Sequence, residues 1–165
     1  MTVSICEATV ADIPLIYRLA LETFPATYRD IISAGQIAFM MDWMYSAESL
    51  RQQMRQGHRF FVGEVDGHPA GYVSLRRESA ACFHLEKLYV LPAAQGTGLG
   101  RRLFERAVAE ARGAQPGAER MELNVNRHNR ALSFYEHMGM RRDRQGDFDI
   151  GNGYFMNDYI MALDL

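Results

Sequence analysis

Cysteine is scarce in this chain of 165 residues, which contains only Cys6 and Cys82. The two thiols stand far apart in apolar, strand-like segments, so we expect buried thiols in a reducing compartment rather than a disulfide framework. An excess of charge of one sign is also lacking, because 18 basic and 20 acidic residues give a formal net charge of -2. A nearly neutral chain has no general attraction to nucleic acid, and we expect no such partner.

Long apolar runs are missing as well, since nowhere do 18 apolar residues follow one another. The N-terminus has no basic start, so we expect a cytoplasmic protein with no membrane partner.

The ligand spacings of zinc sites and the Gly-x-Ser-x-Gly elbow of serine hydrolases are absent, and we expect no metal. The composition that remains, 48% hydrophobic and 23% charged, is ordinary for a globular protein. The length predicts a single domain over residues 1–165.

Apolar periodicity predicts a mixed α/β protein. Thr9 and Asp12 provide a capped start for the first helix, and Pro25 is expected to end or bend it. The Asp66-Gly67 turn and its flanking strands predict an antiparallel meander. The expected strands lie at 4–8, 59–65, 70–76, 82–91, 121–125, 140–144 and 154–165. The expected helices lie at 13–24, 37–45, 46–56, 98–112 and 131–138.

One junction is more informative than any other, because an apolar strand breaks at Pro92, crosses a glycine-rich loop and opens into a helix. Gly96, Gly98 and Gly100 leave backbone N–H groups uncovered, and the helix N-terminus adds unpaired N–H groups and a positive dipole end. Such a junction binds phosphate oxygens, and Arg101 adds positive charge. A turn with only a structural role is the alternative interpretation.

The spacing of the glycines narrows the choice of phosphate ligand. A nucleotide-hydrolase loop needs lysine and a hydroxyl residue after its last glycine, but Arg101 and Arg102 follow Gly100. A dinucleotide loop needs Gly-x-Gly-x-x-Gly, and the third glycine comes one position early here. The pattern Gln95-x-x-Gly98-x-Gly100 after a strand instead resembles the acyl-CoA pyrophosphate loop of the GNAT N-acetyltransferase superfamily.

A second motif carries the same resemblance. Asn124–Met140 combines a strand, an Asn-containing loop and a helix with Ala131-x-x-Phe134-Tyr135 before Gly139, which is similar to the GNAT segment that flanks the pantetheine arm. The resemblance implies a GNAT-like α/β (mixed α+β) fold, with a central, mostly antiparallel, twisted sheet of six to seven strands and helices on both faces. A splayed parallel pair of strands would leave backbone groups that an amide-bearing pantetheine arm can satisfy.

The resemblance implies acetyl-CoA as co-substrate and assigns roles to residues of this chain. Tyr135 would protonate the departing CoA thiolate as general acid. Its position on an apolar stripe suits a packing role equally. The implied CoA-binding residues are Leu88, Tyr89, Val90, Gln95, Gly96, Thr97, Gly98, Leu99, Gly100, Arg101 and Asn129.

The reaction also needs a base that takes a proton from the incoming ammonium group. Glu86 is our candidate, because it lies on the strand before the glycine loop and shares a face with Leu88 and Val90 by period-two alternation. A solvated or ion-paired strand carboxylate next to Lys87 is the competing interpretation. We expect the amine to attack directly within a ternary complex.

The acceptor is predicted from the C-terminal segment and from acidic residues. Asp147–Met161 is similar to the tail of the PaiA-like bacterial polyamine N-acetyltransferases, which makes spermidine or spermine the first expected acceptor. Tyr28, Glu86 and Asp158 are the expected substrate-binding residues. The Met-rich helix at 37–45 either lines this pocket or fills the core.

Other functions stay open at this point. A protein or peptide amine is the alternative acceptor, and a CoA-binding sensor domain without turnover is the alternative to an enzyme. Because many GNAT relatives form pairs, the resemblance also leaves a homodimer open.

Overall fold

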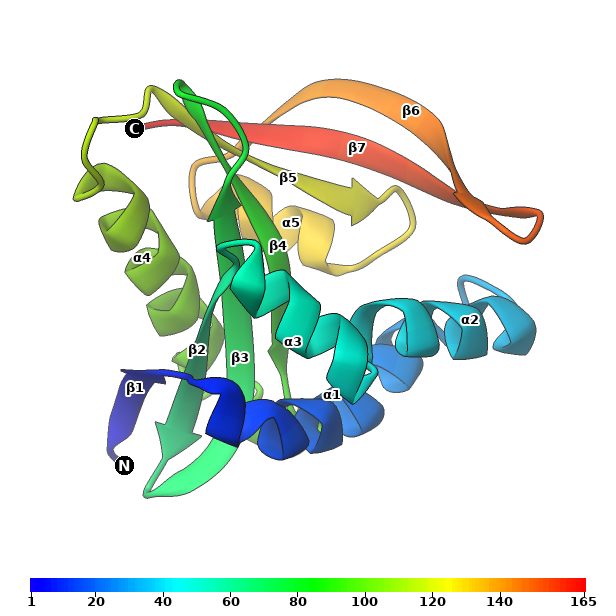
Figure 1. The fold of residues 1–165 in the computed structure, drawn as a ribbon, viewed down its shortest axis with the longest axis horizontal. Coiled ribbons are helices and arrows are strands. Elements are labelled where there is room, and N and C mark those ends of the chain that lie inside the picture. Colours follow the sequence, from blue (N-terminus) through cyan, green and yellow to red (C-terminus); the bar gives the residue numbers. More distant parts are fainter.

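The computed structural model describes residues 1–165 and contains one seven-stranded sheet (Figure 1). The strand order is β1-β2-β3-β4-β5-β7-β6, and only β4 and β5 are parallel. The strands are β1 (Val3–Glu7), β2 (Arg59–Val65), β3 (His68–Arg77), β4 (Cys82–Val90), β5 (Arg120–Asn126), β6 (Arg141–Gly151) and β7 (Tyr154–Asp164). The helices are α1 (Ile13–Tyr28), α2 (Ala34–Tyr45), α3 (Ala47–Arg55), α4 (Leu99–Arg112) and α5 (Ala131–His137). The predicted mixed α/β fold is confirmed.

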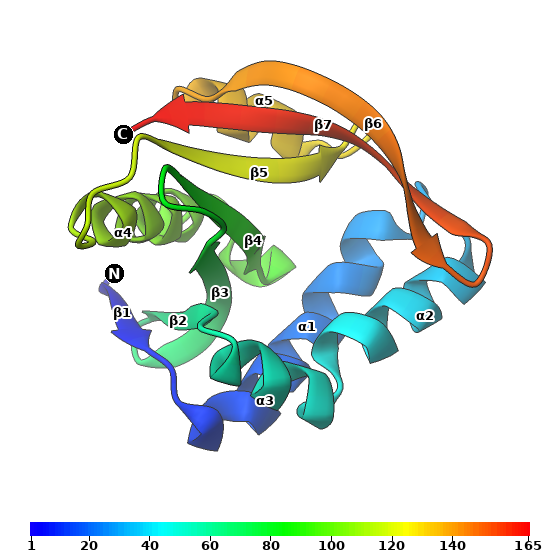
Figure 2. The ribbon, with the colours of Figure 1, turned by 45° about the horizontal axis from the view of Figure 1, so that its top comes forward.

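Helices cover both faces of the sheet, because both faces carry apolar side chains. On one face α4 and α5 form a buried cluster with the sheet through Leu103, Phe104 and Tyr135. On the other face α1, α2 and α3 form a second cluster, which includes Phe24 and Leu50. Figure 2 shows α4 and the group α1–α3 on opposite sides of β3 and β4. None of the helices is both long enough and apolar enough to cross a bilayer.

The parallel strands β4 and β5 separate along their length. Three residue pairs join them, of which His84 with Glu122 is the last. Beyond these pairs β4 is bonded only to β3, and β5 only to β7, although β4 continues to Val90 and β5 to Asn126. The divergence can be followed in Figure 2. The predicted splayed pair is confirmed, and the two facing edges lack a strand partner where they diverge.

A β-bulge interrupts β4 at Glu86. Ser74 on β3 pairs with Lys87, whereas Leu75 pairs with Leu85, so Glu86 has no partner on β3. An extra residue of this kind bends the strand and resets the alternation of its side chains.

The bulge changes the side of the sheet on which Glu86 lies. Leu88 and Val90 pack against the cluster formed with α4. Glu86 instead contacts Arg76 and His84, which pair with each other across β3 and β4 on the opposite face. The expectation that Glu86 shares a face with Leu88 and Val90 is therefore wrong, because the bulge breaks the period-two pattern between them.

Two further expectations need correction. Pro25 does not end α1, which continues to Tyr28, and the alternative expectation of a bend at Pro25 stays a prediction. Phe24 and Tyr28 hold this last turn against the core, with ring centroids 4.6 Å apart. Cys6 is exposed, while Cys82 is buried as predicted. On the edge strand β1, the partly buried positions belong to Val3 and Ile5 and their alternates face solvent.

Gly71 on β3 allows a close approach at the end of β4, and we predict that Gly71→Ala lowers the free energy of unfolding by about 1–3 kcal/mol. A Cβ at this position would lie 2.7 Å from the backbone oxygen of Tyr89 and 3.2 Å from a methyl carbon of Leu103. A backbone oxygen inside a sheet cannot move aside cheaply. Urea denaturation followed by circular dichroism measures the change. Gly117→Ala is the matched control, because an added Cβ there meets nothing within 4 Å. Equal losses in the two variants would contradict the explanation.

Candidate active site

The loop between β4 and α4 presents unpaired backbone donors. Gly96 and Gly98 adopt φ values of +82° and +84°, in the left-handed region that favours glycine. A Cβ added at either position meets nothing within 4 Å. The backbone N–H groups of Gly96, Gly98, Gly100 and Arg101 donate no hydrogen bond within the chain. Gly98 is the N-cap of α4 and offers no side chain to cap it. These donors and the helix dipole fit an anion such as a diphosphate.

Positive charge and an open strand edge accompany the loop. Arg101 is 63% exposed at the start of α4, where its Nε lies 2.9 Å from Glu105 Oε1. On the other side of the loop, Leu88–Val90 belongs to the part of β4 that has no partner on the β5 side. An amide-bearing arm extending from a diphosphate at the loop could pair with this edge as an added strand. The predicted CoA-binding residues are thus brought together, and their individual contacts stay predictions.

Tyr135 on α5 is 7% exposed and packs against Phe104 and Phe134, with ring centroids 6.3 and 5.4 Å away. Burial raises the pKa of its hydroxyl. The hydroxyl is therefore protonated at neutral pH, as a general acid must be before it donates. Packing and acid catalysis are compatible here, and the catalytic role stays a prediction.

Glu86 is held by positive groups. Its Oε1 forms an ion pair with Arg76 and lies 3.2 Å from His84 Nδ1, an ionic contact without the alignment of a hydrogen bond. Burial raises its pKa, but interactions with His84, Lys87 and Arg76 outweigh burial and lower the pKa to about 2. A carboxylate of such low basicity is a weak proton acceptor near neutral pH. This geometry favours the ion-paired interpretation, with Arg76 and His84 rather than Lys87 as the contacts.

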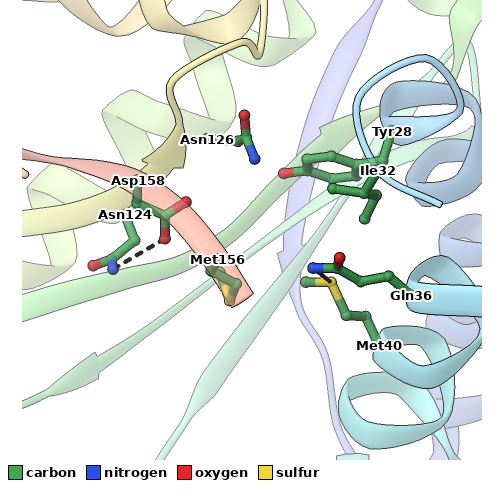
Figure 3. Close-up of a pocket in the computed structure, with 8 residues that line it drawn as sticks. All are labelled: Tyr28, Ile32, Gln36, Met40, Asn124, Asn126, Met156 and Asp158. Atoms are coloured by element: carbon green, nitrogen blue, oxygen red, sulfur yellow. Dashed lines mark hydrogen bonds between the residues drawn. The ribbon is translucent and has the colours of Figure 1, made fainter. Parts of the chain in front are cut away.

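A cavity of about 30 Å³ lies between the end of α1, the following turn, α2, β5 and β7 (Figure 3). This volume admits one or two groups the size of water or ammonium. Of the predicted substrate-binding residues, Tyr28 and Asp158 face this space from opposite sides, whereas Glu86 does not line it. The cavity is lined by Tyr28, Ile32, Gln36, Met40, Asn124, Asn126, Met156 and Asp158.

Asp158 is the acidic group of this cavity and is 1% exposed. Its Oδ2 accepts a hydrogen bond from Asn124 Nδ2 at 3.2 Å. The neighbouring Arg127 guanidinium bonds instead to the backbone oxygen of Asp158 and to the carboxylate of Asp147. Burial raises the pKa of Asp158 to about 6, against the opposing effects of Asn124, Arg127 and His84. A buried carboxylate with no ion-pair partner destabilises the fold when it ionises, and a cation entering the cavity would offset this cost.

Tyr28 connects the cavity to the start of α5. Its hydroxyl lies 3.2 Å from the hydroxyl of Tyr89 and accepts a hydrogen bond from Asn129 Nδ2 at 3.4 Å. Asn129 Oδ1 accepts the backbone N–H of Ala131 at 2.9 Å. Asn129 therefore joins the cavity wall to the helix that carries Tyr135, and its predicted contact with pantetheine stays a prediction.

The hairpin formed by β6 and β7 reaches across to α2 (Figure 1), and β7 contributes Met156 and Asp158 to the cavity wall. Gln36 Nε2 donates to the backbone oxygen of Phe155 at 2.7 Å. The rings of Phe39 and Tyr154 pack with centroids 5.4 Å apart. In the Met-rich helix, Met40 lines the cavity and also belongs to the buried core, so core filling is confirmed and a role in the acceptor pocket stays a prediction.

The chain also contains one group of possible metal ligands, Glu78, Cys82 and Glu122. Glu122 is ion-paired with Arg120 and Arg144, whose charges compete with a cation. Burial raises the pKa of the Cys82 thiol to about 11, which disfavours the thiolate that a metal needs. The donor set fits a metal poorly.

Sequence reasoning missed four polar residues, three that line the cavity and His84, which contacts Asn124. Asn124 and Asn126 alternate with the buried Leu123 and Val125 along β5. This alternation is a usable signal, because it marks a strand with one apolar and one polar face, and the two asparagines of the polar face line the cavity. The missed residues are Gln36, His84, Asn124 and Asn126.

Comparisons with known proteins agree with this geometry. Residues 29–159 match the family model described as an acetyltransferase (GNAT) domain. An uncharacterised N-acetyltransferase of Mycobacterium tuberculosis is 30% identical over 158 residues, which cover 94% of this chain and 99% of that protein.

Two solved structures have the same fold. The PaiA N-acetyltransferase of Thermoplasma acidophilum, crystallised with coenzyme A, superposes with a TM-score of 0.80 at 23% identity, over the full length of both chains. The yncA acetyltransferase of Salmonella typhimurium, with its cofactor acetyl-CoA, gives 0.69 at 23% identity and covers 100% of this chain and 95% of its own. The matched family model, the donor-rich loop and the diverging strands lead to one conclusion: this chain belongs to the GNAT acetyltransferase family and is an acetyl-CoA-dependent N-acetyltransferase.

Proposed function

We propose that this enzyme acetylates a primary amine of a small cationic molecule, with a polyamine such as spermidine or spermine as the first acceptor. The buried Asp158 carboxylate carries this proposal, because it lies in a cavity of ammonium size and has no ion-pair partner. The side chains of Ile32, Met40 and Met156 line the same cavity and suit the methylene stem of an aliphatic amine. The resemblance of the C-terminal segment to polyamine acetyltransferases supports the same acceptor.

Acetyl-CoA supplies the acetyl group as a thioester. In our proposal the free N–H groups of Gly96, Gly98, Gly100 and Arg101 bind its diphosphate, and the free edge of β4 pairs with its pantetheine arm. This arrangement directs the thioester into the gap between β4 and β5. Binding both substrates at once converts the transfer into an intramolecular reaction, with no covalent acetyl-enzyme.

The proton steps use the two buried acids. Asp158, with a pKa of about 6, is ionised above that pH, so it binds the acceptor ammonium and takes one of its protons. The freed amine lone pair attacks the thioester carbon, a C–N bond forms, and the C–S bond breaks. Tyr135 gives its proton to the departing thiolate, and the new amide nitrogen returns its surplus proton to the Tyr135 oxygen. We place Asp158 rather than Glu86 as the base, because a pKa of about 2 leaves Glu86 far less basic.

Diphosphate binding is tested with Gly98→Asp, which we expect to weaken CoA affinity at least 10-fold because it places a carboxylate against phosphate. Asn also tolerates positive φ, so Gly98→Asn imposes similar backbone strain without charge and should retain most of the affinity. Both residues are favourable helix N-caps, so neither should unfold α4. Isothermal titration calorimetry with CoA measures the binding. An Asp variant that binds as well as wild type would remove the loop assignment.

The acid role predicts that Tyr135→Phe lowers kcat by about 100-fold while the Kd for CoA stays the same. The ring still packs against Phe104, so the fold should be retained. Thiol release from acetyl-CoA measures turnover. Tyr159→Phe, on β7 beside Arg142, is the control and should keep its activity. Unchanged turnover in the Tyr135 variant would leave that residue with a packing role only.

The acceptor class is tested by thiol release across spermidine, spermine, amino acids, aminoglycosides and peptides. We expect turnover with the polyamines. Turnover with peptides alone would replace the proposed acceptor by a peptide or protein amine. Acetyl-CoA binding without turnover on any amine would favour a sensor domain.

Asp158→Asn is predicted to raise the KM for spermidine at least 10-fold and to stabilise the fold at pH 8 by about 2 kcal/mol. The folded-state pKa lies above the ordinary value, so ionisation costs stability as the pH rises from about 4 through 6, and the Asn variant avoids this cost. Activity assays and denaturation at pH 4.5 and 8 measure both effects. Asp164→Asn, at the exposed end of the same strand, is the control. A variant with normal KM and no pH-dependent gain in stability would refute the role of Asp158.

A further inference from the structure

A chain of polar contacts continues from the cavity into the sheet. Asp158 on β7 is bonded to Asn124 on β5, and Asn124 Oδ1 lies 3.0 Å from His84 Nε2 on β4. His84 Nδ1 in turn lies 3.2 Å from Glu86, which pairs with Arg76 on β3. The contacts cross four strands, and the contact between His84 and Asn124 spans β4 and β5 where they begin to diverge.

The hydrogen-bond donors and acceptors along this row of polar contacts have a defined order. An ionised Asp158 only accepts, so the amide nitrogen of Asn124 must face it. The amide oxygen of Asn124 then faces His84, and a hydrogen bond forms only if His84 Nε2 carries a proton. On the other side of the ring, the Glu86 carboxylate favours a proton on Nδ1. Burial lowers the pKa of His84, but Glu86 and Asn124 outweigh burial and raise it.

We propose that His84 is a positioning residue for the acceptor site: through Asn124 it holds the Asp158 carboxylate in the orientation that receives the acceptor ammonium. This inference rests on the proposed function of Asp158. It also gives Glu86 and Arg76 a role, because their ion pair keeps His84 oriented towards Asn124.

The charge states of Asp158 and His84, the two titratable residues that Asn124 connects, depend on the groups around them. The charged or titratable groups that act on Asp158 are Tyr28 on α1, His84 on β4 and Arg127 after β5. Those that act on or face His84 are His58, Arg76, Glu78 and Glu86, with Lys87 beside Glu86. Glu86 is the negative group in direct contact with the His84 ring.

The alternative is a purely structural network that joins the diverging strands. Loss of such a network would lower stability, and it would change the Asp158 titration only through the His84 charge, which a Phe and a Gln variant remove equally. The difference in Asp158 titration between these two variants therefore separates the two roles, and carbon-13 NMR of the Asp carboxyl groups measures it without any acceptor. The Asp158 resonance is assigned from its absence in Asp158→Asn.

The experiment compares His84→Phe with His84→Gln. Phe removes both ring nitrogens and frees the Asn124 amide to turn, so Asp158 should titrate about one pH unit higher than in the wild type. Gln offers an amide N–H near the position of Nε2 and should restore at least half of this shift. With spermidine as acceptor, the acid limb of kcat/KM should move in the same direction, and KM should rise about 10-fold in the Phe variant and recover in the Gln variant.

Either of two results would overturn the proposal: an unchanged Asp158 titration in His84→Phe, or a His84→Gln variant no closer to wild type than the Phe variant. If His84→Phe does not fold, Asn124→Leu replaces it. This uncharged change removes both the acceptor for His84 and the donor to Asp158, and it should raise the pH at which Asp158 titrates. An unchanged Asp158 titration in Asn124→Leu would also overturn the proposal.

The experiments distinguish a failure of the proposed acceptor role of Asp158 from a failure of the proposal for His84. If Asp158→Asn leaves the KM for spermidine unchanged, Asp158 does not bind the acceptor, whatever the NMR titration shows. If that KM rises and the His84 variants leave the Asp158 titration unchanged, the acceptor site stands and only the role of His84 is lost.

Discussion

The site depends on the loss of pairing between β4 and β5 after His84. Parallel strands that part inside a folded protein leave rows of peptide groups without partners, and such groups are costly when they are also shielded from water. In the proposed binding mode, the pantetheine arm of acetyl-CoA, which has amide groups along its length, supplies the missing partners. The same divergence also leaves room for polar side chains, such as Asn124, between strands that are otherwise packed tightly.

Stability and chemistry oppose each other at Asp158. The fold buries a carboxylate beside amides and thioethers, provides one hydrogen bond from Asn124, and directs the nearby Arg127 elsewhere. An arginine in contact with the carboxylate would stabilise the protein, but it would occupy the place of the proposed cationic acceptor. Active sites commonly retain such unfavourable arrangements because binding offsets them.

Much of the fold could be predicted from the sequence, because the relevant signals are local. The glycine spacing, the apolar periodicity of α4 and the Ala-x-x-Phe-Tyr helix each act within about one helix or loop. The predictions from sequence were wrong where tertiary packing or strand register overrides the local sequence pattern. Pro25 stays helical because the next turn packs on the core, and Glu86 lies on an unexpected face because a bulge needs information from β3. The cavity was predicted only in part. Tyr28 and Asp158 were expected at the acceptor site, but Asn124 was missed, because only the tertiary fold brings it to the other two residues.

The contact between the β6–β7 hairpin and α2 has a consequence for the range of acceptors. One amide-to-carbonyl hydrogen bond, from Gln36 to Phe155, and one aromatic pair, Phe39 with Tyr154, hold the hairpin against α2. Residues of both segments line the cavity, Gln36 and Met40 from α2 and Met156 and Asp158 from β7. If the acceptor binds there as proposed, side chains at these positions set which amine fits, so relatives with the same CoA loop can differ in acceptor through changes confined to this wall.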